Sequence, residues 1–434
     1  MRKDPTLSPP EVKPKAGVIT QLRHYKIITP LYGGGVEPAQ ADPVTIVRGA
    51  EIRGQLRFWW RATRGGQFGG DLVAMKQAEE AIWGSPAAAG KPGPSKLSIH
   101  VVKTSGGKID RPFEVVSGKG GSPKVQPRKD SVVPPYAAFP LQPSQDKAEV
   151  GMDTKGVLVG VEFWMDIHFS DSLREDVEAA LWAWETFGGV GARTRRGFGA
   201  LQLVSLHENG RMKHIDVPKC SEVDDWIYQN LKHYAVGHWH PYVPHLGVDM
   251  HIKTIGSYKT ATDAWRTLID DLQSFRQWRH KKFGLSLWPE ANYIRKRFGK
   301  SLKWPPNVSR PALIEKFPRG KFGLPIIFHM PHDKGLLPTD SFTLQGRPVQ
   351  GKTTDRLSSP LLLRPFACRH GSVGLAAILD APKIPPEGLE VAGFPSGKNT
   401  VSADLTPQDA RTEPLNQILN GEPDVLKAFL DYLE

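Results

Sequence analysis

Apolar residues occupy every second position from Val157 to Phe169, which is the most regular pattern in the chain. Glu162, Asp166 and His168 are among the residues between them, so the opposite face of the same segment is largely polar. A period of two residues is typical of a β-strand with one buried face. The pattern therefore predicts one continuous strand over residues 157–169, packed on a hydrophobic core.

The segment after this strand has the pattern of a helix that leads into a glycine-rich loop. Ser172 and Glu175 have the spacing of a capping box, which predicts the start of a helix. One face of this helix carries three apolar residues: Val177, Leu181 and Trp184. Gly188–Gly189 predicts the helix end. A strand is expected over residues 200–206, after the loop.

The remaining patterns complete an α+β fold. The first half reads strand, helices, strand, strand, helix, strand, an order that suits a ferredoxin-like sandwich. Its other predicted elements are strands at 18–28 and 95–103 and helices from about 52 and over about 71–83. In the second half we expect helices at about 221–234, 261–282 and 424–433, and strands at about 322–329, 360–368 and 373–380.

These elements divide the chain into a tail and two domains. Residues 1–16 are rich in Pro and Lys and are expected to form a disordered tail. The N-terminal domain is expected to cover 17–206 and the C-terminal domain 207–434. Residues 104–156 are rich in Gly, Pro, Ser and Lys, which predicts a long loop or an insertion in the first domain.

Composition limits the class of protein and of partner. Lys and Arg number 57 against 45 Asp and Glu, a net charge of +12 that fits a polyanionic partner or an anionic membrane surface. We find no apolar run near the ~18 residues of a membrane span and no apolar signal-peptide core, so we expect a soluble protein. Cys220 and Cys368 lie far apart without a CxxC motif. This argues against a disulfide framework or a zinc ribbon and fits a reducing cytoplasm.

The first segment that indicates a ligand is RGAEIRGQLRFWWRATRGGQFGG, residues 48–70. Its arginines recur every three to five residues, at Arg48, Arg53, Arg57, Arg61 and Arg64, and the last four would line one side of a helix. Trp59 and Trp60 interleave with them. Guanidinium groups bind phosphates and aromatic rings stack on bases, so this pattern favours contact with nucleic acid. The alternative is that the tryptophans are core anchors and the arginines a solvated face.

The second segment is the glycine-rich loop GGVGARTRRGFG, residues 188–199. Successive backbone amides in such loops form anion-binding nests. Arg193, Arg195 and Arg196 add positive charge. The loop follows a helix and precedes a strand, which is the reverse of a dinucleotide-binding loop. The alternative is a plain turn with incidental basic residues.

The third segment, residues 275–304, alternates basic and aromatic residues, a pattern suited to single-stranded RNA. Its first cations are Arg276, Arg279, Lys281 and Lys282. The alternative is a basic amphipathic helix packed on a neighbouring subunit.

The histidines at 233, 238, 240, 245 and 251 lack a convincing metal-ligand spacing within one element. We therefore predict no metal site and no cofactor.

Together these segments resemble the RAMP superfamily, in the branch of the first subunit of the Cmr complex, the type III-B CRISPR effector. The resemblance rests on ITPLYGGG (28–35), IRGQLRFWWRATRGG (52–66), IWGS (82–85), FGGVGARTRRGFGAL (187–201), FGLPIIF (322–328) and RLSSPLLLRP (356–365). The residues that match the motifs of this family are Arg53, Arg57, Trp59, Trp60, Arg61, Gly189, Gly191, Arg193, Arg195, Arg196, Phe198, Arg356, Ser358 and Arg364.

The resemblance implies two tandem ferredoxin-like (RRM-like) domains. It also implies a non-catalytic subunit that lies near the 3′ end of the guide RNA, beside other RAMP subunits, and helps to capture target RNA. Our hypothesis is therefore a subunit that binds guide crRNA and single-stranded target RNA.

Two other functions remain open. One is a metal-independent ribonuclease that processes CRISPR precursor RNA, which requires a histidine beside the glycine-rich loop, with His24 or His168 as candidates. The other is a purely architectural subunit whose basic segments contact acidic protein partners.

Overall fold

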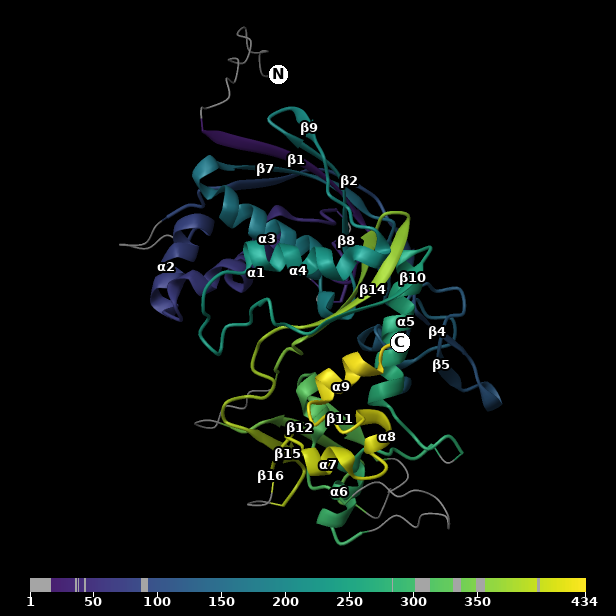
Figure 1. The fold of residues 1–434 in the computed structure, drawn as a ribbon. Helices are drawn as coiled ribbons and strands as arrows, with labels where there is room; N and C mark the ends of the chain where they lie inside the picture. Colours follow the sequence, from purple (N-terminus) through teal and green to yellow (C-terminus); the bar gives the residue numbers. More distant parts are fainter. Residues whose placement is uncertain are drawn as a thin grey trace.

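The computed structural model describes residues 17–35, 37, 39–42, 44–86, 93–282, 284–300, 313–330, 337–348, 356–395 and 399–434. The predicted tail at 1–16 lies outside these ranges. The fold is α+β, with helices packed on several antiparallel sheets. A five-stranded sheet lies at one end of the molecule, a four-stranded sheet at the other, and a three-stranded sheet between them (Figure 1).

The five-stranded sheet has the order β2-β7-β1-β8-β9, and all its neighbouring strands are antiparallel. Its strands are β1 (Val18–Ile27), β2 (Ser98–Ser105), β7 (Glu162–Ser170), β8 (Leu201–Glu208) and β9 (Arg211–Lys213). The helices of this half are α1 (Gly49–Arg64), α2 (Leu72–Trp83) and α3 (Arg174–Phe187). The succession β1–α1–β2–β7–α3–β8 matches the βαββαβ connectivity predicted for this half.

Helices α1 and α3 cover one face of this sheet (Figure 1). Tyr25 and Phe163 of the sheet share a hydrophobic core with Leu56 of α1 and with Leu181 and Trp184 of α3. The apolar period of two on β7 and the helical spacing on α3 therefore meet in one core, as elements with one apolar face require.

Two local predictions for this half are wrong. Residues 157–169 form two strands instead of one, because Gly160 has a φ of 78° and breaks the pairing. The first piece, β6 (Val157–Val159), pairs with β3 (Lys108–Asp110), whereas β7 pairs with β1 and β2.

The capping box is also absent. Ser172 lies in a 3₁₀ turn, Asp171–Leu173, and its hydroxyl contacts the hydroxyl of Ser170 at 2.9 Å. Helix α3 begins after this turn, at Arg174, with no side-chain cap. The carboxylate of Glu175 instead accepts a hydrogen bond from Arg64 of α1 at 3.2 Å.

The stretch 104–156 is an insertion with its own structure. Besides β3 it holds a hairpin of β4 (Phe113–Ser117) and β5 (Pro123–Pro127). Phe113 and Val133 of the insertion are buried, and they share a small core with Trp265 of the second half. The insertion is thus packed against the rest of the chain.

The second half contains the other two sheets. The three-stranded sheet has the order β10-β14-β13, and the four-stranded sheet the order β11-β12-β15-β16. Their strands are β10 (Ile252–Tyr258), β11 (Ile326–His329), β12 (Ser341–Gly346), β13 (Leu361–Cys368), β14 (Gly371–Ile378), β15 (Leu389–Ala392) and β16 (Thr400–Val401). The helices are α4 (Val223–Tyr234), α5 (Ala261–Arg276), α6 (Pro289–Arg297), α7 (Pro407–Arg411), α8 (Asn416–Leu419) and α9 (Val425–Tyr432).

Three predicted bounds in this half change. Helix α5 ends at Arg276 instead of 282, because the chain then turns and pairs Arg279 with Ser286. The strand expected from 322 begins at Ile326, since residues 318–322 form a 3₁₀ turn that ends at Gly323, where φ is 105°. The strand expected at 373–380 is β14, which is shifted toward the N-terminus by two residues at each end. The second ferredoxin-like domain stays a prediction.

Strand β13 lies between two cores. Leu361 and Leu363 belong to the core under α5 and α9, while Leu362 and Phe366 belong to the core under α1 and α3. Burial on both faces explains why apolar residues occupy neighbouring positions of this strand, as at 361–363, instead of alternating with polar ones. The core under α1 and α3 therefore includes residues from both halves of the chain.

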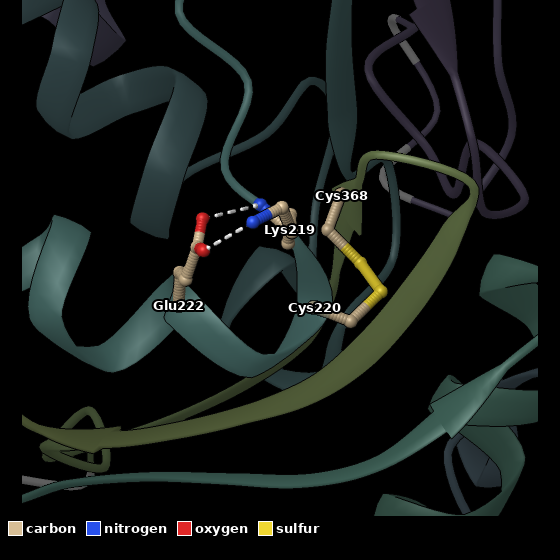
Figure 2. The surroundings of a disulfide bond; sticks show 4 residues. All are labelled: Lys219, Cys220, Glu222 and Cys368. Atoms are coloured by element: carbon tan, nitrogen blue, oxygen red, sulfur yellow. Dashed lines mark hydrogen bonds and ion pairs between the residues drawn. A yellow bond between two sulfur atoms is a disulfide. The ribbon is translucent and has the colours of Figure 1, made fainter.

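A disulfide joins Cys220 to Cys368, although the spacing of the two cysteines argued against a disulfide framework (Figure 2). The two Cα atoms lie 5.2 Å apart, although 148 residues separate them in sequence. Cys220 precedes α4 and Cys368 ends β13, and the backbones of Lys219 and Arg369 pair beside them. Spacing along the chain could not reveal this contact, which the sheet and the helix create together.

Candidate nucleic-acid interface

The arginines of α1 contact carboxylates of the same chain. Arg57 Nε and Arg61 Nη1 both donate to Glu79 Oε1 of α2, each at 2.6 Å, and Glu79 is only 6% exposed. Arg64 pairs with Glu175 and lies 3.6 Å from Asp176. The predicted arginine stripe thus ties α1 to α2 and α3.

The two tryptophans of α1 belong to the core. Trp59 is 3% exposed and Trp60 is fully buried. The indole nitrogen of Trp60 donates to Asp176 at 2.7 Å. Neither ring offers a free face to a base. The alternative, in which the tryptophans are core anchors, is therefore correct for this pair. Of the other predicted residues here, Arg48 donates to the carbonyl of Gly34, and Arg53 is half-buried.

The glycine-rich loop is held at the end of the sheet by close backbone contacts. The Gly191 amide donates to the carboxylate of Glu51, so this acid of α1 positions the loop. Gly191 and Gly199 have φ values of 82° and 64°, and a Cβ on Gly199 would lie 1.8 Å from the carbonyl oxygen of Val190. Gly189 is buried, and Phe198 packs against Trp265 of α5 with ring centroids 4.9 Å apart. These glycines and Phe198 therefore determine the backbone conformation and the packing of the loop.

The loop arginines bind main-chain carbonyls. Arg193, with a φ of 59°, donates to Ala137 at 3.0 Å, and Arg195 donates to Ser359. Arg196 donates to Leu361 at 3.2 Å and to Phe322 at 3.3 Å. A carbonyl carries no net charge, so these bonds hold the guanidinium groups in place while leaving their charge uncompensated.

Arg276 completes the group from the C-terminal end of α5. Its Nη1 donates to the hydroxyl of Tyr136 at 3.1 Å, and its buried Nε has no hydrogen-bond partner. Arg193, Arg196 and Arg276 line two adjoining cavities of about 590 and 460 Å³, and Arg195 lines the smaller one. We call these four residues, with the two cavities, the arginine cleft.

The cleft has a strong excess of positive charge. Among the described residues that line the two cavities there is no Asp or Glu. Burial lowers the pKa of Arg193 and of Arg195. Burial, followed by repulsion from Arg276 and Arg193, lowers the pKa of Arg196 to about 9. Charged groups held together without a counter-charge favour a bound anion.

The other predicted residues have different places. Ser358 lines the smaller cavity, and Arg356 is exposed two residues before it. Arg364 is 1% exposed and donates to Gly188 and Leu201 at 2.7 and 2.9 Å, so it joins β13 to the loop and to β8. The turn after α5 carries three exposed cations, Arg279, Lys281 and Lys282, none of which lines the two cavities.

One wall of the cleft was missed by sequence reasoning. The larger cavity is lined in part by Phe113, Tyr136, Phe139 and Gln142, all from the insertion 104–156. These residues follow no period and belong to no motif, so the sequence offered no signal for them. Only the packing of the insertion against α5 brings them beside the arginines.

The histidines take structural positions. His24 stacks on Trp164 with centroids 4.0 Å apart and pairs with Glu162, and His168 contacts the hydroxyl of Thr20. Neither histidine lines the arginine cleft. Within the described ranges, no group of three or more His, Cys, Asp or Glu residues is placed to hold a metal ion. Nor is any helix there both long and apolar enough to cross a membrane.

Comparison with known proteins agrees with the predicted family. Residues 24–202 match the model of the RAMP superfamily, so the predicted membership is confirmed for this part of the chain. The CRISPR system Cmr subunit Cmr1-2 of Pyrococcus furiosus is 27% identical over 186 residues, which are 42% of this chain and 93% of that protein.

Two solved structures align with most of the chain at low sequence identity. The apo crystal structure of Cmr1 from Pyrococcus furiosus has a TM-score of 0.49 and 16% identity, over 85% of this chain and 90% of that one. A chain of the type III-B Cmr-beta complex, solved bound to cognate target RNA, has a TM-score of 0.48 and 13% identity, over 95% of this chain and 100% of that one.

Proposed function

We propose that this chain, whose residues 24–202 match the RAMP superfamily model, is an RNA-binding subunit of a type III-B CRISPR (Cmr) effector complex. In this role it contacts guide crRNA near its 3′ end and single-stranded target RNA, and it lies beside other RAMP subunits in the cytoplasm. The likeness to the Cmr1-2 subunit supports the assignment to such a complex.

The observation that carries RNA binding is the arginine cleft. Four arginines from two elements, the glycine-rich loop and α5, lie around adjoining cavities whose described lining has no carboxylate. Their hydrogen-bond acceptors are neutral, main-chain carbonyls for the loop arginines and the Tyr136 hydroxyl for Arg276, so the geometry is held without neutralising the charge. Phosphates of a nucleic-acid backbone supply the missing counter-charge, and guanidinium groups bind them with two parallel hydrogen bonds.

Binding without catalysis is favoured over the ribonuclease alternative. A metal-independent ribonuclease needs a general acid or base beside the bound phosphate, most often an imidazole. The described residues that line the cleft include no histidine, and the two candidate histidines contact Trp164 and Thr20 elsewhere. The proposed subunit therefore holds RNA and leaves its cleavage to other proteins of the complex.

The test is the salt dependence of RNA binding by the Arg276→Gln variant. Each phosphate contact with a single strand contributes about 0.7 to the slope of log K against log salt concentration. We expect the variant to bind a single-stranded RNA oligomer more weakly, with a slope shallower by about that amount, in a fluorescence anisotropy titration. Arg276 is half-buried at the helix end, so a thermal melt of the variant accompanies the titration.

The matched control is Arg266→Gln on the same helix. Arg266 is exposed, donates to Ser131 and Val132, and lies outside both cavities. The Arg266→Gln substitution removes the same charge from α5 as Arg276→Gln does. Equal losses of RNA affinity in the two variants would therefore show a diffuse charge effect and contradict a specific cleft. Wild-type affinity and slope in Arg276→Gln would contradict it as well.

A further inference from the structure

The larger cavity of the cleft has two chemically different walls. Arg193, Arg196 and Arg276 form the basic wall. Phe139 of the insertion and Ile327 of β11 belong to the same lining, and both are large apolar residues with high exposure, 68% and 66%. Exposed apolar side chains that gather at a hollow indicate a binding surface more than a solvated one.

Size and polar groups narrow the ligand class. The cavity volume of about 590 Å³ lies in the ~300–1,000 Å³ range of small-ligand sites. Two side-chain amides, Gln142 and Gln277, belong to the same lining and are both exposed. A carboxamide both donates and accepts hydrogen bonds, as the edge of a nucleobase does.

We propose that the insertion 104–156 makes this cavity a pocket for one unstacked nucleobase of single-stranded RNA. The base lies against Phe139 with its edge toward Gln142 or Gln277, and the adjoining phosphates lie on Arg193, Arg196 and Arg276. This pocket rests on the proposed function and refines it, because it adds contact with a base to contact with the backbone.

Charge selects a nucleotide over an apolar peptide as the occupant. The three arginines are shared by both cavities, so a strand can pass from the smaller one into the larger one along a continuous basic wall. An apolar peptide would cover the same arginines without neutralising them, at the cost of desolvating three charges. An RNA strand satisfies the basic wall and the aromatic wall together.

The experiment compares two probes on the full chain. One is a single-stranded oligouridylate and the other is the same ribose-phosphate chain without bases. Stacking of a base on an aromatic side chain contributes about 1–3 kcal/mol, which corresponds to about 5- to 150-fold in affinity. We expect Phe139→Ala to weaken binding of the oligouridylate by this factor and to leave binding of the abasic chain unchanged.

Two controls separate stacking from other effects. The salt slope of Phe139→Ala should equal that of the wild type, since no phosphate contact is lost. Ile109→Ala removes another exposed apolar residue of the same insertion, 61% exposed and outside the cavity, and should bind both probes like the wild type. Phe139→Trp keeps an aromatic face and should retain the affinity for oligouridylate.

The outcomes distinguish the two proposals. If the wild type binds neither probe at low salt, the proposed function fails. If it binds both probes and Phe139→Ala binds oligouridylate like the wild type, the base pocket is overturned while backbone binding stands. An equal loss for both probes also overturns the pocket, because the side chain then acts on something other than a base.

Discussion

At the scale of single residues, the same side-chain type takes three roles in this protein. Arg57 and Arg61 pair with a buried carboxylate, Arg364 holds main-chain carbonyls in the interior, and Arg196 contributes charge to a cleft. Charge reversal at Arg57 and Arg61 would place two acids against Glu79, so lost RNA binding in such a variant would reflect disturbed packing. Substitutions in the arginine cleft test RNA binding more directly.

Arg364 is expected to be a stability determinant. Its guanidinium donates from two separate nitrogens to the carbonyls of Gly188 and Leu201, whereas a lysine carries its donors on one nitrogen and lacks this planar fork. Leaving a buried acceptor unpaired costs about 1–3 kcal/mol. We expect Arg364→Lys to lower the free energy of unfolding by about 2–5 kcal/mol in urea denaturation.

Arg356→Lys is the matched control for this substitution. Arg356 is exposed in the same segment, so its replacement should change stability by less than about 0.5 kcal/mol. Equal effects of the two substitutions would show that the carbonyl contacts of Arg364 contribute little.

At the scale of elements, helix α5 packs closely on the glycine-rich loop. The indole nitrogen of Trp265 on α5 donates to the carbonyl of Arg196 at 2.7 Å, and the ring packs on Phe198. A Cβ on Gly197 would lie 2.5 Å from the same indole. Helix α5 can approach this closely only because residue 197 is a glycine, and the approach brings Arg276 beside the loop arginines.

The disulfide between the α4 turn and β13 is a second contact between elements (Figure 2). Closing a long loop lowers the entropy of the unfolded chain and typically stabilises a protein by about 2–4 kcal/mol. We expect reduction to lower the urea midpoint accordingly, with two thiols titrated after reduction and none before. The double variant Cys220→Ser, Cys368→Ser should have the lower midpoint with and without reductant. An unchanged midpoint after verified reduction would contradict a stabilising bond.

At the scale of the whole molecule, the two predicted domains share a core. Leu362, Phe366 and Val373 of the second half lie in the same buried cluster as Tyr25 and Phe163 of the first. The boundary predicted near residue 206 therefore separates segments of sequence whose apolar faces cover each other. The arginine cleft lies at this junction, because its arginines come from both halves.

A shared core predicts cooperative unfolding. Neither half can open without exposing the apolar surface that it covers on the other, so the two halves should unfold in one calorimetric transition. Tryptophan fluorescence should follow the same curve, since Trp184 and Trp265 are buried in different halves. Two separated transitions, with these probes reporting different midpoints, would show that the halves are independent.

Sequence patterns alone determined the α+β class, most element positions in the first half, the RAMP resemblance and the glycine-rich loop with its arginines. These depend on local periods and turn residues, which neighbouring side chains in sequence control. Tertiary structure alone decided that Trp59 and Trp60 are core, that Arg57 and Arg61 share Glu79, and that Cys220 meets Cys368. It also placed Phe139 in the same cavity lining as Arg276. Each of these depends on contacts between residues distant in sequence, which no local period encodes.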